Sequence, residues 1–294
     1  LIGSKMSGMR YEAPGTVDEA VALLAGAKGD ARVLAGGTDL LVQIRAGMIS
    51  PGLVVDIKKI AETKGITAKG GGFSVGASVP GAEMGEHAKL KAAWPGVVEG
   101  AELIGSTQVQ GRATMAGNLC NASPAADSVP ALIAAGATCT VAGPKGQREV
   151  PVKDIPTGPG ETSLANGEFV VDIKLPARLA HASDAYLRMI PRTEMDIAIV
   201  GAGVNLVLDD GGTCTEACVV LGAVGPTTIV VADAAAALVG SKVDDAALAA
   251  VAAAASAAAT PIDDKRGTIE YRTKVAGVLA SRAAAIAADR ARSK

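Results

Sequence analysis

The chain has 294 residues, 49% of them hydrophobic and 20% charged, so it can bury a substantial core and is not disordered as a whole. Its 28 basic and 30 acidic residues give a formal charge of −2, which argues against an electrostatic grip on nucleic acid. Aromatic residues make up only 2%, which argues against a base-stacking platform or an aromatic sugar-binding cleft.

The cysteines and the apolar segments indicate a cytoplasmic protein. The four cysteines are dispersed along the chain, which favours reduced thiols over a disulfide framework or a metal site; they are Cys120, Cys139, Cys214 and Cys218. The most apolar stretch, 246–259, is mostly alanine and shorter than the roughly 20 residues of a membrane span, so no transmembrane segment is expected. Residues 1–8 lack the long apolar segment of a secretory signal.

The first 60 residues predict a small α/β subdomain. Thr16 and Glu19 have the spacing of a capping box, which predicts a helix from residue 17 to about residue 26. A short apolar run at 32–35 then stops at two glycines and gives way to a helical pattern at 39–45. A strand is predicted at 53–57.

The next part, up to residue 178, predicts further strands around one irregular segment. Strands are predicted at 73–77, 137–142, 148–152 and 168–175, and an interrupted helical stretch at 90–103. Between 107 and 130, small and polar residues alternate without a clear period, which predicts a long loop. Such a loop inside a compact domain is usually functional.

Beyond a domain boundary at 176–183, strands are followed by helices. Three strands are predicted, at 184–190, 197–208 and 214–224. Three helices follow, at 232–238, 244–259 and 269–288. This order is typical of an α+β domain.

Two segments have residues suited to binding a nucleotide diphosphate. Gly36 and Gly37 lie between a predicted strand and helix, where missing Cβ atoms permit close approach and free N–H groups can hold an anion. A purely structural turn is the alternative, because the glycines match neither the G-x-G-x-x-G nor the P-loop pattern. Residues 114–118 offer small, hydroxyl and amide groups, and Asp127 lies downstream as a ribose or water ligand.

The remaining polar residues are weaker indications of a functional site. Residues 188–196 place two arginines and two acids between apolar strands, either as a functional loop or as a solvated turn. His87 and His181 have no partners at the spacing of a hydrolase or a metal site, so neither catalytic nor metal-binding residues are predicted.

The segments 33–40, 114–127, 158–160 and 195–198 occur together in this order, and with them the chain resembles the FAD-binding medium subunit of molybdenum hydroxylases. This is the family of xanthine dehydrogenase and carbon monoxide dehydrogenase, and the resemblance covers residues 9–290. It implies an α+β protein that begins with a vanillyl-alcohol-oxidase (PCMH) type FAD-binding domain at 6–178. That domain would consist of two α/β subdomains, 6–60 and 61–178. A small α+β domain with a three-stranded antiparallel sheet and helices would follow at 179–292.

The resemblance also implies which residues contact FAD. They are Val33, Leu34, Ala35, Gly36, Gly37, Thr38, Asp39, Leu40, Ile104, Thr114, Met115, Ala116, Gly117, Asn118, Asp127, Val170, Arg188 and Ile197. Two positions depart from the family pattern: Arg188 stands where relatives often have Lys, and Ala116 where they often have Gly. The first change keeps the charge but alters its geometry.

The implied function is electron transfer within a larger enzyme. Electrons would pass from [2Fe-2S] clusters of a small partner subunit through FAD to an external acceptor, after substrate oxidation on a large molybdopterin subunit, in a dimer of heterotrimers. The chain has no cysteine array for an iron-sulfur cluster, so those centres are expected on other chains. The alternatives are a stand-alone FAD-dependent oxidoreductase of the same fold, and an assembly protein that has lost the cofactor. The substrate and the acceptor, whether oxygen, NAD or a quinone, stay open.

Overall fold

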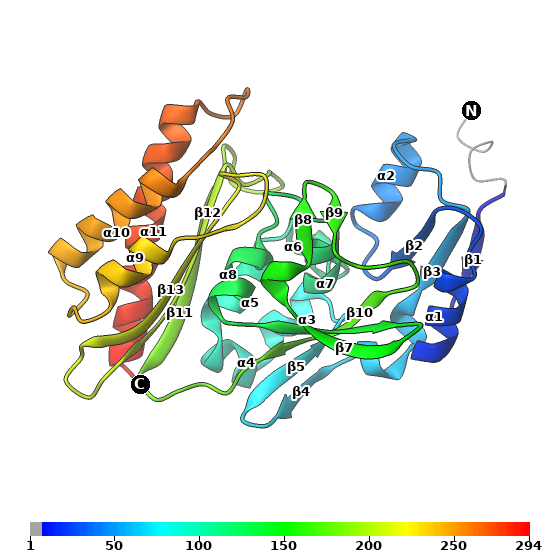
Figure 1. Cartoon of the computed structure of the whole chain (residues 1–294), viewed down its shortest axis with the longest axis horizontal. Coiled ribbons are helices and arrows are strands. Elements are labelled where there is room, and N and C mark those ends of the chain that lie inside the picture. Colours follow the sequence, from blue (N-terminus) through cyan, green and yellow to red (C-terminus); the bar gives the residue numbers. More distant parts are fainter. Residues whose placement is uncertain (1–7) are drawn as a thin grey trace.

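Three larger sheets follow one another along the chain and form a row (Figure 1), and a fourth sheet consists of two short strands. The computed structural model describes residues 8–294, so the predicted domain start at residue 6 and nearly all of segment 1–8 lie outside the described residues. None of the described helices is both long and apolar enough to cross a membrane.

The first sheet is small and parallel, with strand order β1-β3-β2. Its elements are β1 (Arg10–Glu12), α1 (Val17–Ala25), β2 (Ala31–Leu34), α2 (Leu40–Ala46) and β3 (Leu53–Asp56), followed by the single-turn helices η1 (Ile57–Lys59) and η2 (Ala61–Thr63). The predicted cap is present, since the Thr16 hydroxyl accepts a hydrogen bond from Glu19 N at 3.2 Å. The predicted α/β subdomain therefore forms, with β1 as an added edge strand that was not predicted.

The second sheet is antiparallel, with strand order β4-β5-β10-β6-β7. Its strands are β4 (Ile66–Lys69), β5 (Gly72–Gly76), β6 (Thr138–Gly143), β7 (Gly146–Pro151) and β10 (Phe169–Leu175). The helices between β5 and β6 are α3 (Gly81–Glu86), α4 (Ala88–Ala93), α5 (Pro95–Glu102), α6 (Thr107–Gln110), α7 (Met115–Cys120) and α8 (Ser128–Ala134). The connection from β7 to β10 contains η3 (Val152–Asp154) and the short strands β8 (Pro156–Gly158) and β9 (Glu161–Thr162).

The prediction of a long loop at 107–130 is wrong. The segment contains α6, α7 and the beginning of α8, and the Thr114 hydroxyl caps α7 by accepting from Gly117 N at 2.9 Å. These helices are too short for an apolar period to emerge. α6 has no buried residue, so it offers no apolar face to read, and α7 buries only Met115, Ala116 and Leu119.

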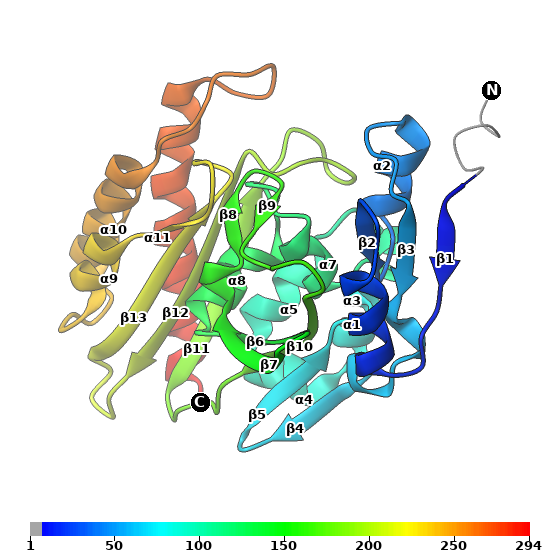
Figure 2. The same ribbon diagram turned by 45° about the vertical axis from the view of Figure 1, so that its right-hand side comes forward.

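The third sheet is antiparallel and has four strands, not the three that were predicted. Its strands are β11 (Ala182–Met189), β12 (Val200–Leu208), β13 (Cys214–Gly222) and β14 (Ile229–Val230). The added strand β14 has two residues and pairs with Val220 and Leu221, and a run that short has no alternation to read. The helices α9 (Ala232–Leu238), α10 (Asp245–Ala258) and α11 (Ile269–Arg292) cover one face (Figure 2).

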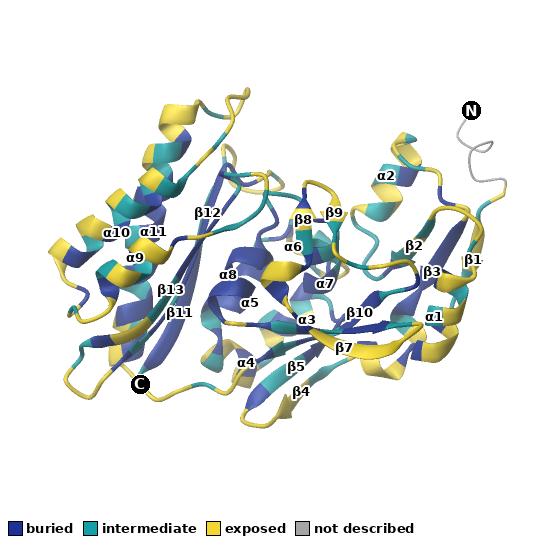
Figure 3. Cartoon of the chain, viewed as in Figure 1, coloured by how far each residue is buried: buried dark blue, intermediate teal, exposed yellow. Residues whose placement is uncertain are grey.

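The opposite face of this third sheet packs against α5 and α8, so it is enclosed between helices of both domains. Figure 3 shows the resulting continuous buried layer through β11, β12, α8 and α5. Gly203 of β12 permits the close packing, because a Cβ there would lie 2.7 Å from the carbonyl carbon and oxygen of Pro130 in α8.

Polar contacts hold the same junction in register. Asp184 of β11 accepts from Val97 N of α5 at 3.0 Å and from Arg178 Nη2 at 2.8 Å. The Arg178 guanidinium lies 3.8 Å from the centre of the Trp94 ring, a cation–π contact. Arg290 of α11 adds an ion pair to Glu99 of α5.

A Gly203→Ala substitution tests this packing. The added methyl group meets backbone rather than a movable side chain, so we expect the free energy of unfolding to fall by about 2 kcal/mol in urea titrations. Gly111→Ala is the matched control: its Cβ would lie 3.7 Å from Gln108 O, and a change within about 0.5 kcal/mol is expected. Equal stability of both variants would contradict the packing described.

Candidate functional site

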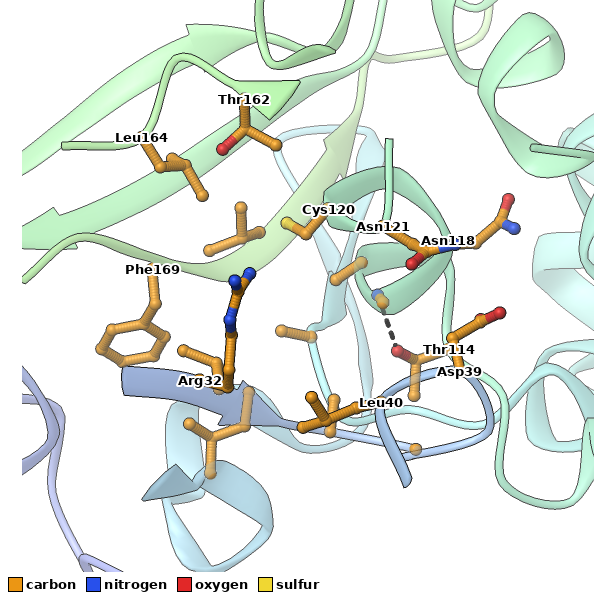
Figure 4. Close-up of a pocket in the computed structure, with 18 of the residues that line it drawn as sticks. Arg32, Asp39, Leu40, Thr114, Asn118, Cys120, Asn121, Thr162, Leu164 and Phe169 are labelled. Carbon is orange, nitrogen blue, oxygen red and sulfur yellow. Dashed lines mark hydrogen bonds between the residues drawn. The ribbon is translucent and has the colours of Figure 1, made fainter. Parts of the chain in front are cut away.

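A cavity of about 350 Å³ lies between the first two sheets. One wall consists of β2 and the loop that leads from it into α2. The second wall comes from residue 113 to α7, and the third from the segment 162–170 ahead of and into β10. Figure 4 shows side chains from all three walls turned toward the same space.

The first two walls meet backbone against backbone at Gly36. A Cβ on Gly36 would lie 2.0 Å from the carbonyl oxygen of Arg112 and 3.1 Å from Ala113 Cα, so any side chain would push the walls apart. Gly37 has a φ of +78°, a left-handed conformation that favours glycine. Both glycines of the predicted loop are therefore required, each for a different reason.

The loop presents backbone donors that the fold does not use. Within residues 8–294, no hydrogen bond occupies the backbone N–H groups of Gly36, Gly37 or Thr38, all of which line the cavity. Arg32 is the one basic side chain among the lining residues described, and it is paired with Asp30 at 2.9 Å. An anion in this cavity would therefore be held largely by backbone dipoles, as in other N–H nests.

The cavity has a polar end and an apolar end (Figure 4). Asp39, Thr114 and Asn118 lie at the polar end, where Gln43 Nε2 also donates to Asn121 Oδ1 at 3.0 Å and so joins α2 to the end of α7. Leu164 and Phe169 lie at the more apolar end, where the side chains of Arg32 and Thr162 also lie. This polarity suits an elongated ligand with one apolar ring system and a charged or hydroxylated centre.

Burial shifts two ionisable groups of the cavity toward their neutral forms. It raises the pKa of Asp39 above its usual range and the pKa of the Cys120 thiol to about 12. At neutral pH Cys120 is therefore protonated and a poor nucleophile.

Thirteen of the predicted site residues line this cavity: Val33, Ala35, Gly36, Gly37, Thr38, Asp39, Leu40, Ile104, Thr114, Ala116, Gly117, Asn118 and Val170. Leu34 and Met115 are buried next to lining residues, and the Leu34 side chain packs under Gly37. Two segments that are far apart in the sequence are thus brought together.

Asp127, Arg188 and Ile197 do not line the cavity. Asp127 Oδ2 accepts from Arg188 Nη1 at 2.7 Å, and Asp127 Oδ1 accepts from the Tyr186 hydroxyl at 3.2 Å. Burial raises the pKa of Asp127 to about 6, although Arg188 and Tyr186 act in the opposite direction. The three side chains form a buried cluster between α8 and β11.

Ile197 lies in the loop after β11 and is 42% exposed. This loop reaches back to the second sheet's helices, because Glu194 Oε1 accepts from Thr107 N at the start of α6 at 3.2 Å. Arg192 pairs with Asp196 at 3.0 Å within the loop. The acidic and basic residues predicted there therefore pair largely with the protein itself.

Sequence reasoning missed most of the third wall. The lining residues that it did not nominate include Arg32, Cys120, Thr162, Leu164 and Phe169. The turn at Asn166 and Gly167, ahead of an apolar strand, was a usable signal, and Gly167 has a φ of +82°. Nothing in the sequence indicated that the start of this strand lines the same cavity as β2.

Two family models match the chain. A model of the FAD binding domain in molybdopterin dehydrogenase matches residues 5–178, and one of the CO dehydrogenase flavoprotein C-terminal domain matches residues 185–287. Together they cover nearly the whole chain and define an FAD-binding flavoprotein.

Individual relatives and solved structures agree. The chain is 33% identical to the carbon monoxide dehydrogenase medium chain of Hydrogenophaga pseudoflava, over 93% of this chain and 94% of that protein. It is 32% identical to the xanthine dehydrogenase FAD-binding subunit of Escherichia coli O157:H7, over 74% and 75%. A structure of CO dehydrogenase from Oligotropha carboxidovorans matches with a TM-score of 0.91 at 33% identity, covering 96% of this chain and 98% of that one. The chain therefore belongs to the family of FAD-binding medium subunits of molybdenum hydroxylases.

The residues of the cavity fit this cofactor. The close approach at Gly36, the free N–H groups beside it and the apolar end at Phe169 match the needs of a diphosphate flanked by ring systems.

A Gly36→Ala substitution tests the cavity. Because the new methyl group collides with the Arg112 carbonyl, we expect the FAD content of the purified chain, measured by absorbance after denaturation, to fall at least about tenfold. Gly52→Ala is the control, since its Cβ would lie 3.8 Å from its nearest contact, Asp30 O. Full FAD content in the Gly36 variant would show that the cofactor is held elsewhere.

Proposed function

We propose that this chain is the electron-transfer subunit of a heterotrimeric molybdenum hydroxylase. Electrons would reach its FAD from [2Fe-2S] clusters of a small partner subunit and leave to an external acceptor. The observation that carries the proposal is the cavity between the glycine loop at 36–37 and the segment from residue 113 into α7, in a chain that belongs to the FAD-binding subunit family. FAD, when bound, supplies the capacity to accept and release electrons.

The chain's own residues would bind and orient the cofactor. Backbone groups of 36–40 and 114–118 would surround the diphosphate and the ribityl chain, and Ile104 and Val170 would contribute apolar contacts. The neutral Cys120 thiol adds no charge to the cavity. We assign Asp127, Arg188 and Ile197 to the cofactor's surroundings, with the buried ion pair ordering β11 and the loop that follows it.

Substrate oxidation would take place on a large molybdopterin subunit. Of the two acids that line the cavity in the described part of the chain, Glu168 is paired with Arg148 at 2.8 Å and Asp39 is shifted toward its neutral form. Asp39 has no ion pair among the described residues, and a raised pKa is what a carboxylate base uses, so the lining acids do not decide between the two roles. Membership of the FAD-binding subunit family is what favours the subunit role over a stand-alone oxidoreductase.

The relatives support an assembly. They include carbon monoxide dehydrogenase medium chains and a subunit of the 6-hydroxypseudooxynicotine dehydrogenase complex of Paenarthrobacter nicotinovorans, which is 30% identical over 96% of this chain. We infer a dimer of heterotrimers in the cytoplasm, with the domain boundary between 178 and 185. The four unpaired thiols are consistent with that compartment.

The decisive experiment isolates the chain with its native partners and quantifies FAD, iron and molybdenum. We expect one FAD per copy of this chain, both metals, and two further polypeptides. In the complex, substrate should bleach the flavin, whereas the isolated FAD-loaded chain should not respond to the same substrate.

The complex that carries Gly36→Ala in this chain is the comparison, because only its FAD cavity is altered. It should keep both metals and still show substrate reduction of the iron-sulfur clusters, but transfer to the external acceptor should be lost. Substrate turnover by the isolated chain without metals would instead favour the stand-alone oxidoreductase.

A further inference from the structure

Behind the glycine loop, outside the cavity, lies a short chain of polar contacts that no motif indicated. Lys58, in the turn η1 after β3, donates from Nζ to the carbonyl oxygen of Ala35 at 3.0 Å. The same ammonium group pairs with Asp56 Oδ1 at 2.8 Å. The Tyr11 hydroxyl of β1 donates to Asp56 Oδ2 at 2.6 Å. All three strands of the first sheet are thus linked to one peptide group of the loop.

The Asp56 carboxylate is itself fixed in place by burial and by hydrogen bonds. The side chain is only 9% exposed, and Lys58 N donates to it as well, at 3.0 Å. Burial acts to raise the pKa of Asp56, but the hydrogen bonds from Lys58 and Tyr11 outweigh burial and hold that pKa below its usual range. Asp56 is therefore a fixed negative anchor that places the Lys58 ammonium.

The position of the Ala35 carbonyl determines where the next N–H points. A trans peptide group is planar, so its C=O and N–H bonds point in opposite directions. The Ala35 oxygen is turned toward Lys58, and the Gly36 N–H of the same peptide group is therefore turned away from it. Gly36 lines the cavity, and no hydrogen bond within residues 8–294 uses its N–H.

The Ala35–Gly36 peptide group needs a contact from outside the loop to keep one orientation. Glycine has no Cβ to restrict its dihedral angles, so a peptide group next to Gly36 and Gly37 can rotate at little steric cost. A charged donor on its carbonyl makes one orientation clearly preferred. The loop is then already ordered in the folded protein, so ligand binding does not have to supply the free energy of ordering it.

We propose that Lys58, placed by Asp56 and Tyr11, is a positioning residue for FAD binding: it holds the Ala35–Gly36 peptide group so that the Gly36 N–H is aimed at the cofactor's diphosphate. The inference rests on the proposed FAD site and deepens it. Lys58 does not line the cavity, so its effect passes through the backbone and not through direct contact with the ligand.

The test compares binding of three probes to the full chain freed of FAD. FAD and ADP both carry a diphosphate, whereas riboflavin does not. In Lys58→Met we expect the dissociation constants of FAD and ADP to rise about tenfold, while that of riboflavin stays within about twofold. Lys58→Arg, which keeps a charged donor, should restore most of the FAD affinity.

Two further variants separate this role from general effects. Lys59→Met removes the same charge from the exposed neighbouring residue and should leave all three dissociation constants unchanged. Tyr11→Phe removes the outermost contact and should weaken FAD binding less than Lys58→Met does. The thermal midpoint of each FAD-free variant shows whether the first sheet stays folded.

Unchanged FAD and ADP binding in Lys58→Met would overturn the inference while leaving the proposed function intact. Equal weakening of all three probes together with a lowered thermal midpoint would also overturn it, in favour of a purely structural lysine. Failure of the unaltered chain to bind FAD would overturn the proposed function and this inference with it.

Discussion

The backbone of the glycine loop meets the backbone of Arg112 and Ala113 at Gly36, and this contact fixes the distance between two walls of the cavity. One segment leaves a parallel sheet and the other enters a short helix beside an antiparallel sheet, and no side chain fits between them. Each sheet serves as a rigid support that delivers one wall to the same point. The cavity is therefore a property of the contact between two subdomains and belongs to neither alone.

The backbone-lined cavity shows how a chain with little net charge can bind an anionic cofactor. The family's cofactor has a doubly charged diphosphate, yet the chain has a net charge near zero and one basic side chain among the cavity residues described. Backbone dipoles provide the positive field at short range without a lysine inside the cavity. The positive charge of Lys58 stands behind the loop, where it acts on a carbonyl group and does not occupy the space of the ligand.

The sequence predicted elements with strong local signals and failed where tertiary contacts decide. The Thr16 cap, the glycine loop and the three C-terminal helices follow from spacing alone. The segments 33–40 and 114–118, which the family resemblance assigned to one cofactor, line the same cavity. The two-residue β14 and the short α6 and α7 were missed because neither a period of 2 nor one of 3.6 shows in so few residues.

Most of the third wall, all but Val170, was missed for a different reason: its apolar residues resemble any core strand until β10 is known to border the cavity. Arg188 shows the limit of assigning residue roles by comparison with relatives. Its guanidinium finds a carboxylate, Asp127, inside this chain, which a residue-by-residue comparison did not anticipate.

The position of Trp94 makes its fluorescence a probe of the junction between the two domains. It is the only tryptophan in the sequence, it is 2% exposed, and a guanidinium group covers its ring at the junction between the two domains. Its emission therefore reports on that one junction without background from other indoles. Tryptophan emission overlaps flavin absorption, so a bound flavin within range would quench it by energy transfer, whereas exposure of the ring to water on separation of the domains would shift the emission to longer wavelength.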